Sequence, residues 1–362
     1  MKNNIYFFLL LLLGLPLYLQ ANSSESKEFR ADEYILDHVV DSYGWHITTI
    51  KEKDIAIPLP IIIVEKGKFY CFLSSKFHHG NNAYKGFALG FTEETKGKII
   101  KLQGDEENYT GFLEIDKPYT WKSIVIDLSI TKNVCAVFIS IALIGLIFIS
   151  VAKKYKRNPN SAPKGFQGII EVVILFIRDE VAIPLIGHKY HKFLPYLLTL
   201  FFFILINNLM GLLPIFPGGA NVTGNIAVTM VLALFTFFVF TFSANKNYWK
   251  HIFNPPGIPW WLKFPLPLLT IIEMVGLFTK PFVLMIRLFA NIMAGHIIIL
   301  SFLGLIFIFG AMTPAIGYFV SPISILIYVF MGLLELLVAF IQAFVFTMLT
   351  ALYIGMAIEE HT

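Results

Sequence analysis

Two long apolar runs near the C-terminus constrain the fold more than any other feature of the chain. They cover residues 266–309 and 316–357, and only isolated ionisable residues interrupt them. A helix of about 40 residues is ~60 Å long, roughly twice the ~30 Å apolar thickness of a bilayer. Each run is therefore predicted to form either a re-entrant pair or one strongly tilted helix. Because no turn cluster or charged break divides either run, we expect two long tilted helices.

Composition and three further apolar stretches predict a polytopic membrane protein. The chain is 56% hydrophobic and only 14% charged, whereas charged residues make up ~25% of soluble domains. Residues 134–152, 193–213 and 225–242 each have the length of a single span. Residues 164–183 mix apolar side chains with charges and are predicted to form an amphipathic helix on the membrane surface. We expect an all-α membrane domain with five transmembrane helices.

The first 130 residues differ from the rest of the chain. Residues 1–21 combine a lysine, an apolar stretch and a small residue, which is typical of a signal peptide; an uncleaved signal anchor is the alternative. Residues 22–130 contain alternating segments (61–64 and 68–73) and turn clusters, which predict a small strand-containing extracytoplasmic segment without a catalytic pattern. The membrane domain is expected to occupy residues 131–362.

The positions of the basic residues orient the predicted spans. Loops 153–192 and 243–263 carry Lys and Arg, whereas loops 214–224 and 309–318 carry neither. Basic loops are cytoplasmic in most membrane proteins, so the N-terminal segment is predicted outside and the C-terminus inside. The net charge is only +4, and the Lys and Arg residues flank the apolar spans instead of forming a basic stripe. They give no reason to expect nucleic-acid binding.

No cofactor or metal site is predicted. His78 and His79 have no third ligand nearby in the sequence and are interpreted as part of a turn. A disulfide between Cys71 and Cys135 is not expected, because Cys135 falls inside an apolar span.

Arg287 lies inside the first long apolar run. A guanidinium at membrane depth costs several kcal/mol, ~2.5 to 17 depending on the scale, and arginine cannot lose its proton to avoid that cost. No carboxylate lies one turn away, so we expect its partner on another chain. At ~100° per residue, Glu273, Lys280 and Asn291 share its helix face. Glu273 and Lys280 also have a purely structural interpretation, as a pair seven residues apart.

An antiparallel arrangement of the two long helices brings further ionisable residues together. If Arg287 is level with Gln342, then His296 comes within one turn of Glu335. His296 and Glu335 would then lie on the outer side of Arg287, and Glu273 on its inner side.

Such an arrangement predicts a role in proton transfer. A His–Glu pair at membrane depth can exchange protons near neutral pH. An immovable positive charge between two polar pockets prevents protons from crossing directly, so a proton must ride on a carrier between them. The inner pocket would contain Glu273 near Glu359 and Glu360. The structural alternatives are that Glu335 only contacts a neighbouring helix and that His296 only packs.

Five other residues are candidates for helix packing. Asn207, Asn208 and Asn225 are expected either to form interhelical hydrogen bonds or to line a wet cavity. Gly295 and Gly332 are expected to permit close approach of two helices.

Several motifs resemble subunit a of F-type ATP synthases. They are RLFANIMAGH (287–296), LLVAFIQAFVF (336–346), NLMGLLP (208–214) and EEH (359–361), within a resemblance that covers about residues 130–362. The resemblance implies a non-catalytic subunit of the bacterial inner membrane that forms the stator half of a proton path. It implies as partners the rotating c-ring, subunit b of the peripheral stalk and the lipid bilayer.

The resemblance also assigns residues. Arg287 resembles the essential arginine that faces the c-ring carboxylate. His296 and Glu335 match the pair that lines the outer half-channel, which some bacterial members carry in the reverse order. Some members carry Asp where this chain has Gly211. A polar contribution of that helix to the outer path is therefore in doubt. Asn291 and Gln342 match polar residues near that arginine. Glu273 resembles an acidic residue of the inner side.

Two other classes of function compete with this interpretation. A self-contained secondary transporter would normally show internal repeats and discontinuous helices, and no repeat is found. An intramembrane enzyme would need a nucleophile with its base or a set of metal ligands, and no such motif is found.

Overall fold

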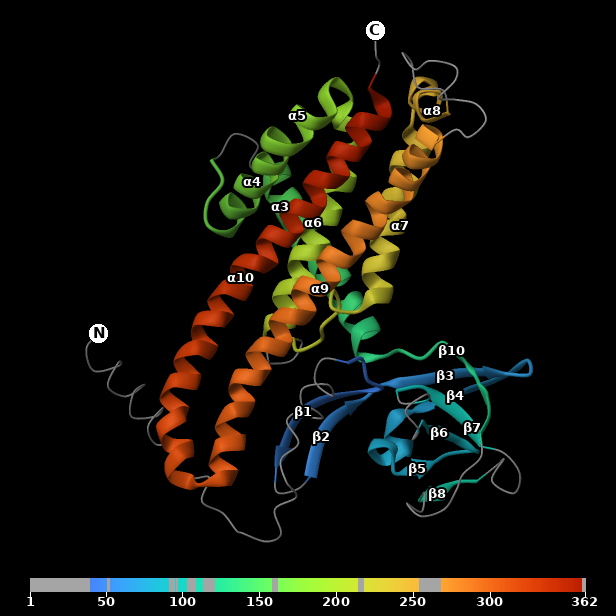
Figure 1. Ribbon diagram of the computed structural model, residues 1–362, viewed down its shortest axis with the longest axis vertical. Coiled ribbons are helices and arrows are strands. Elements are labelled where there is room, and N and C mark those ends of the chain that lie inside the picture. Colours follow the sequence, from blue (N-terminus) through green and yellow to red (C-terminus); the bar gives the residue numbers. More distant parts are fainter. Residues whose placement is uncertain are drawn as a thin grey trace.

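The computed structural model (Figure 1) describes residues 40–50, 53–90, 95, 97–102, 109–112, 121–157, 162–213, 218–253 and 268–359. The predicted signal peptide, the turn at 104–107 and Glu360 lie outside these residues. A strand-rich segment lies at one end of a helical bundle, and the chain passes from one to the other where helix α3 begins (Figure 1).

The strand-rich segment consists of four small antiparallel sheets among the described residues, in the orders β1-β2, β10-β3-β4, β5-β8 and β6-β7-β9. The strands are β1 (Gly44–Ile50), β2 (Lys53–Pro58), β3 (Pro60–Glu65), β4 (Lys68–Leu73), β5 (Asn82–Ala83), β6 (Phe87–Leu89), β7 (Ile99–Leu102), β8 (Gly111–Phe112), β9 (Trp121–Ile124) and β10 (Ile126–Asp127). The prediction of a strand-containing N-terminal segment is confirmed.

The hairpin β3–β4 shows how the sequence forms this segment. Its turn is Lys66–Gly67, and both residues have positive φ values (46° and 78°), as a type I′ hairpin turn requires. On β3, Ile61 and Ile63 alternate with less buried residues and lie in the core with Phe87 of β6. The 3-10 helix η2 (Ser74–Gly80) follows β4 and contains His78.

Hydrogen bonds fix the strand-rich segment to the start of helix α3 (Lys132–Arg157). The Asp41 carboxylate accepts hydrogen bonds from the backbone N–H groups of Ser42 (2.9 Å) and Asn133 (3.0 Å). The Lys132 N–H donates to the Ser42 carbonyl at 2.8 Å. Asp41 therefore satisfies a donor in the first turn of α3 from a distant part of the sequence, which is a capping interaction.

The helices that follow are α4 (Phe166–Phe176), the π-helical η4 (Ile177–Ala182), α5 (Ile183–Ile186), the 3-10 helix η5 (Gly187–Lys189), α6 (Tyr190–Leu212), α7 (Ile226–Ser243), α8 (Lys246–Phe253), α9 (Leu268–Met312) and α10 (Pro314–Ile358). Within the described part of the chain, α3, α7, α9 and α10 are long and apolar enough to cross a membrane. These four of the five predicted spans, and the all-α polytopic class, are confirmed. The fifth forms α6, which packs between α3 and α10 with Leu197, Phe201 and Ile204 fully buried.

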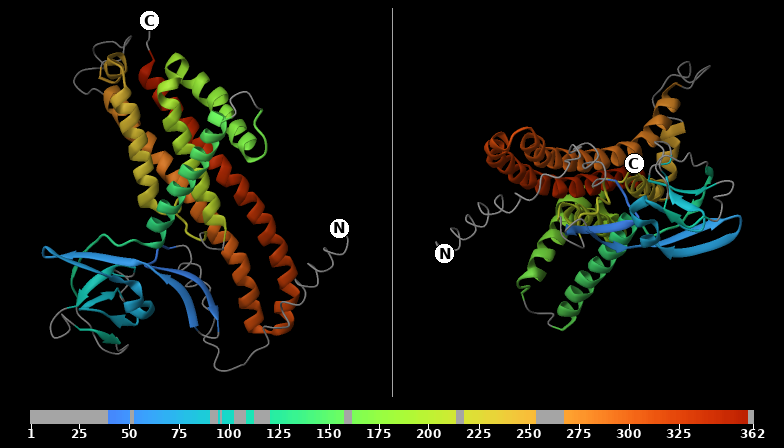
Figure 2. Two further views of the ribbon diagram at one scale, coloured as in Figure 1. Left: turned by 180° about the vertical axis from the view of Figure 1, so that it is seen from behind. Right: turned by 90° about the horizontal axis from the view of Figure 1, so that it is seen from below.

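The two long apolar runs form single continuous helices, as predicted. Each of α9 and α10 has 45 residues, and only Thr313, with an extended backbone, separates them. They lie side by side as an antiparallel hairpin and cross α3 obliquely (Figure 2). Re-entrant pairs are therefore wrong for this chain.

The predicted amphipathic helix corresponds to α4, η4 and α5. Ile177 and Val181 are buried toward the bundle, while Phe166, Ile169 and Val172 are exposed. This segment, α8 and the C-terminus lie at one end of the bundle, and the strand-rich segment lies toward the other (Figure 1). The predicted basic loops are thus gathered at the end away from the strands.

Candidate functional site

His296 of α9 and Glu335 of α10 are in direct contact. Nδ1 of His296 lies 2.5 Å from Oε1 of Glu335, and the two side chains are only 14% and 5% exposed. The antiparallel hairpin brings them together across 39 residues of sequence. The contact expected when Arg287 is set level with Gln342 is present.

Two glycines leave room for this pair. A Cβ atom on Gly295 would lie 2.8 Å from Oε1 of Glu335, and a Cβ atom on Gly211 of α6 would lie 3.3 Å from Nε2 of His296. The packing role predicted for Gly295 is confirmed. For Gly332 no such role is found within this chain, because a Cβ atom there would have no neighbour within 4 Å among the described residues. The family resemblance drew attention to Gly211 as a position on the outer path, but it did not reveal the close approach of α6 to His296 there.

Buried amides extend this polar region onto α6. The Asn208 amide N–H donates to the Ala339 carbonyl of α10 (3.0 Å), and the Thr223 hydroxyl donates to Oδ1 of Asn208 (2.6 Å). Asn207 donates to the Ser140 hydroxyl of α3 at 3.1 Å. Interhelical hydrogen bonds are thus confirmed for Asn207 and Asn208. They are wrong for Asn225, whose side chain caps the start of its own helix α7 by accepting from the Ala227 N–H.

Some buried polar atoms of this region have no protein partner among the described residues. They are Nε2 of His296, Oε2 of Glu335, Oδ1 of Asn207 and Nδ2 of Asn221. Buried polar groups are rarely left without a hydrogen bond, and ordered water is their usual partner when protein supplies none. We call the region formed by His296, Glu335, Asn207, Asn208 and Asn221 the outer polar cluster.

A second polar region lies around Lys280, nearer the C-terminus of α10. We call Glu273, Lys280, Tyr248 and Tyr353 the inner polar cluster. Nζ of Lys280 lies 6.0 Å from the ring centre of Tyr248 of α8 and 5.5 Å from that of Tyr353 of α10, within reach of cation–π attraction. Burial raises the pKa of Tyr248, and the negative charge of Glu273 adds to this effect. The predicted inner acid, Glu273, therefore lies near enough to Tyr248 for its charge to act on that phenol. Glu359 is exposed where α10 ends.

Arg287 lies between the two clusters. It is seven residues from Lys280 and nine from His296, which corresponds to ~10 Å and ~13 Å along a helix axis. Its side chain is half-buried, and it forms no hydrogen bond or ion pair with any residue that the structure describes. Counting nine residues onward from Glu335 reaches Phe344, so the buried Gln342 is within two residues of the level of Arg287. Asn291, one turn further on, is exposed.

A buried chain of hydroxyl groups was not predicted. The Tyr196 hydroxyl of α6 lies 3.1 Å from Oγ1 of Thr236 of α7, which lies 3.5 Å from Oγ1 of Thr350 of α10. These contacts join three helices through their interior. Each apolar span carries more than one hydroxyl side chain, and the sequence does not reveal which of them face one another.

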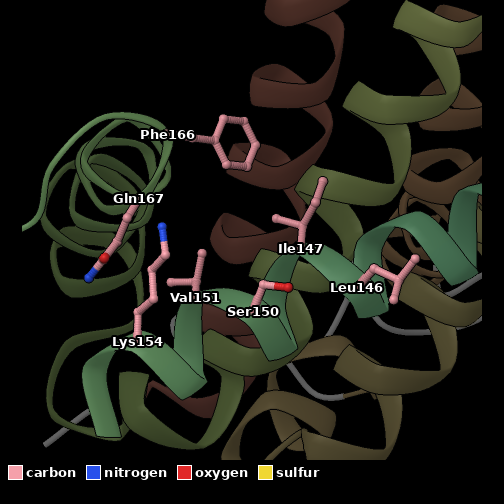
Figure 3. A pocket seen from close by; sticks show the side chains of 7 residues that line it. All are labelled: Leu146, Ile147, Ser150, Val151, Lys154, Phe166 and Gln167. Atoms are coloured by element: carbon pink, nitrogen blue, oxygen red, sulfur yellow. The ribbon is translucent and has the colours of Figure 1, made fainter. Parts of the chain in front are cut away.

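A separate cavity lies between α3 and α4. It has a volume of about 270 Å³, and Figure 3 shows Ile147 and Val151 of α3 facing Phe166 of α4 across it. Its lining is mostly apolar, with Lys154 near the end of α3. None of the residues of the two polar clusters lines it. Among the described residues there is also no group of three side chains suited to hold a metal ion.

Comparison with known proteins relates most of the chain to one family. A family described as "ATP synthase A chain" matches residues 134–355, and one described as "Domain of unknown function (DUF8433)" matches residues 34–121. ATP synthase subunit a of Chloroherpeton thalassium is 45% identical over 243 residues, 65% of this chain and 69% of that protein. ATP synthase subunit a of Chlorobium phaeobacteroides is 42% identical over 296 residues, 78% of this chain and 82% of that protein.

Proposed function

The chain belongs to the ATP synthase A chain family, and on that premise we propose that Arg287 separates two half-channels that lead protons to and from a rotating ring of c subunits. As a member of this family, the chain is the proton-translocating stator subunit of the membrane sector. In the proposal it is non-catalytic, and the ATP chemistry takes place on other subunits. Proton flow past this chain drives ATP synthesis there.

The outer polar cluster supports one half-channel. His296 and Glu335 offer an imidazole and a carboxyl group in contact, and both have a second, unpartnered polar atom that can bind water. A proton can pass from water to such a pair and on to a carboxylate of the ring. Asn207, Asn208 and Asn221 would keep the approach polar.

The inner polar cluster supports the other half-channel. Glu273 accepts the proton released by the ring and passes it to water near the exposed end of α10, where Glu359 lies. Lys280 and the ring of Tyr353 lie between Glu273 and Arg287 along the hairpin. The two clusters share no residue. In the proposal a proton therefore crosses from one cluster to the other while bound to a carboxylate of the ring.

The position of Arg287 is the observation that carries the proposal. A half-buried guanidinium without an ion pair among the described residues costs several kcal/mol unless a partner from another chain approaches it. The ring carboxylate would be that partner when deprotonated. The cation would then repel a proton moving directly between the clusters. Gln342 and Asn291 would supply polar contacts near the same point.

The surface beside Arg287 fits a neighbouring membrane protein. Val283 and Ile286 of α9 and Leu337 and Ile341 of α10 are exposed, so the hairpin presents apolar side chains around the arginine. The c-ring would cover this surface, and subunit b of the peripheral stalk would hold the chain still. In the bacterial inner membrane, the strand-rich segment would lie outside and the C-terminus in the cytoplasm, as the basic loops predict.

A stand-alone secondary transporter is the second candidate, and the structure gives it less support. Such transporters typically bind their substrate at helices that are broken near the middle of the membrane. Here α9 and α10 are continuous over 45 residues each, and the sequence shows no internal repeat.

Substitution Arg287→Ala tests the proposal in membranes that contain the whole complex. Proton-driven ATP synthesis should be lost while ATP hydrolysis by the catalytic sector persists. Thr279→Ala is the matched control, because Thr279 is an exposed residue of the same helix whose hydroxyl bonds only to the Gly276 carbonyl. Normal ATP synthesis by the Arg287→Ala complex would refute the proposal.

A further inference from the structure

One face of the sheet β10-β3-β4 is apolar and exposed. Phe69 and Leu73 of β4 are 66% and 49% exposed, and Ile126 and Leu128 at β10 are 65% and 60% exposed. Val64 of β3 pairs with both Phe69 and Ile126, and the Leu128 N–H donates to the Ile62 carbonyl, so these side chains form one surface. We call it the outer sheet face: Ile62, Val64, Phe69, Leu73, Ile126 and Leu128. A contiguous apolar surface of this kind marks contact with protein or membrane.

The outer sheet face is turned toward the side of the helical bundle. The opposite face of β3 packs through Ile61 and Ile63 onto residues of β6 and β7. Figure 1 shows β3 and β10 on the side of the segment nearest the helices, with β6, β7 and β8 beyond them. The hairpin β3–β4 also projects sideways past the outline of the helices in the view from below (Figure 2). The helices of this chain therefore leave this face open.

The junction with α3 holds the sheet in this orientation. The Ile130 N–H donates to the Pro60 carbonyl of β3 at 3.0 Å, and the next residues are bonded to Ser42 and Asp41. Helix α3 starts four residues after Leu128. Its own outward side chains, such as Phe138 and Ile141, are 60% and 53% exposed and are suited to face lipid. A helix with exposed apolar side chains therefore begins four residues after the outer sheet face ends.

We propose that the outer sheet face rests on the bilayer surface from which α3 emerges. Phe69, Ile126 and Leu128 would enter the boundary between headgroups and acyl chains, where aromatic and aliphatic side chains of peripheral segments bind. Lys66, exposed at the turn of the β3–β4 hairpin, would contact lipid phosphates. The strand-rich segment is then held at the membrane surface and sets the depth and tilt of α3. This inference does not depend on the path of the protons.

Cys71 makes the proposal directly testable. It is a free and exposed cysteine of β4, and it pairs with Ile62 on the outer sheet face. A nitroxide spin label on Cys71 in a Cys135→Ser chain reports whether this position lies in lipid, water or protein. The control is the chain Cys71→Ser, Cys135→Ser, Ser75→Cys. Ser75 is also exposed, but it lies in η2, which packs on β5 and β6.

The full chain is placed in vesicles of phosphatidylethanolamine and phosphatidylglycerol, alone and within its complex. Collision rates are measured with oxygen, which concentrates in lipid, and with a water-soluble nickel chelate. The label at position 71 should collide faster with oxygen than with nickel, and the label at position 75 should show the reverse. Equal nickel access at both positions overturns the proposal in favour of a water-exposed sheet. Protection of position 71 from both reagents overturns it in favour of a protein partner or a second copy.

Discussion

His296 and Glu335 meet at 2.5 Å across the hairpin of α9 and α10, each held on a different helix of 45 residues. The contact marks which levels of the two helices lie side by side. Counting from it shows which residues of α10 are near the level of Arg287. The pair has a structural effect on the hairpin as well as its proposed chemical one, and substitutions must separate the two.

A double-mutant cycle separates the effects of His296 and Glu335. His296→Gln and Glu335→Gln should each slow ATP-driven proton pumping, and the double variant should be little worse than the poorer single variant, because both side chains serve one step. Removing one partner of a buried pair costs ~3–5 kcal/mol, so the amount of assembled complex must be measured in parallel. Independent, additive losses with normal assembly would contradict a shared role.

Gly295→Ala should reduce proton pumping strongly. Its new methyl group would lie 2.8 Å from Oε1 of Glu335, which forces the carboxylate away from His296. Gly276→Ala on the same helix is the control, because its methyl group meets nothing within 4 Å; it should pump normally and gain up to ~1 kcal/mol of helix stability. Equal pumping by the two variants in inverted vesicles would show that the position of Glu335 is unimportant.

Gly211→Asp should change how pumping depends on pH. Its carboxylate would extend toward Nε2 of His296, which lies 3.3 Å from the position of a Cβ atom. A nearby negative charge favours the protonated imidazole, so the pH of half-maximal pumping should rise by roughly one unit or more. Gly211→Asn has the same shape without the charge and should leave this pH unchanged. An unchanged pH of half-maximal pumping in the Asp variant would place His296 outside the rate-limiting proton transfer.

The strand-rich segment should become less stable at alkaline pH. Burial raises the pKa of Tyr43, and its hydrogen bond to Asp127 adds to this effect. In the unfolded chain the phenol loses its proton near pH ~10, while the folded segment keeps it, so stability falls as pH rises above that value. Protease resistance of the segment, measured in vesicles from pH 8 to 11, should fall less steeply in Tyr43→Phe. Parallel curves for the two proteins would assign the alkaline loss to other groups.

The sequence predicts the hairpin and its polar pair because both follow from spacing. A run of about 40 apolar residues without a break leaves few alternatives to one long helix. Two such helices in antiparallel order place 296 near 335 once Arg287 is set level with Gln342. The periodicity of a helix is regular enough for this argument to succeed over ten residues.

The contacts to other helices were less predictable. Gly211 lies beside His296, whereas a Cβ atom on Gly332 would have no neighbour within 4 Å among the described residues, because the rotation of each helix is set by packing with all of its neighbours. Asn225 caps α7 because the chain leaves a buried loop at that residue. The chain of Tyr196, Thr236 and Thr350 needs three helices to be placed correctly at once.

Passive proton permeability tests the role of Arg287 most directly. Vesicles that contain the whole complex are treated so that the catalytic sector stays attached and its turnover is blocked by an inhibitor, which holds the rotor still. The decay of an imposed pH gradient is then followed for Arg287→Ala, Thr279→Ala and the unchanged protein. If the guanidinium keeps two polar clusters apart, Arg287→Ala should leak protons faster than both others, although its complex makes no ATP. A leak no faster than that of the Thr279→Ala control, together with normal ATP synthesis, would contradict the account.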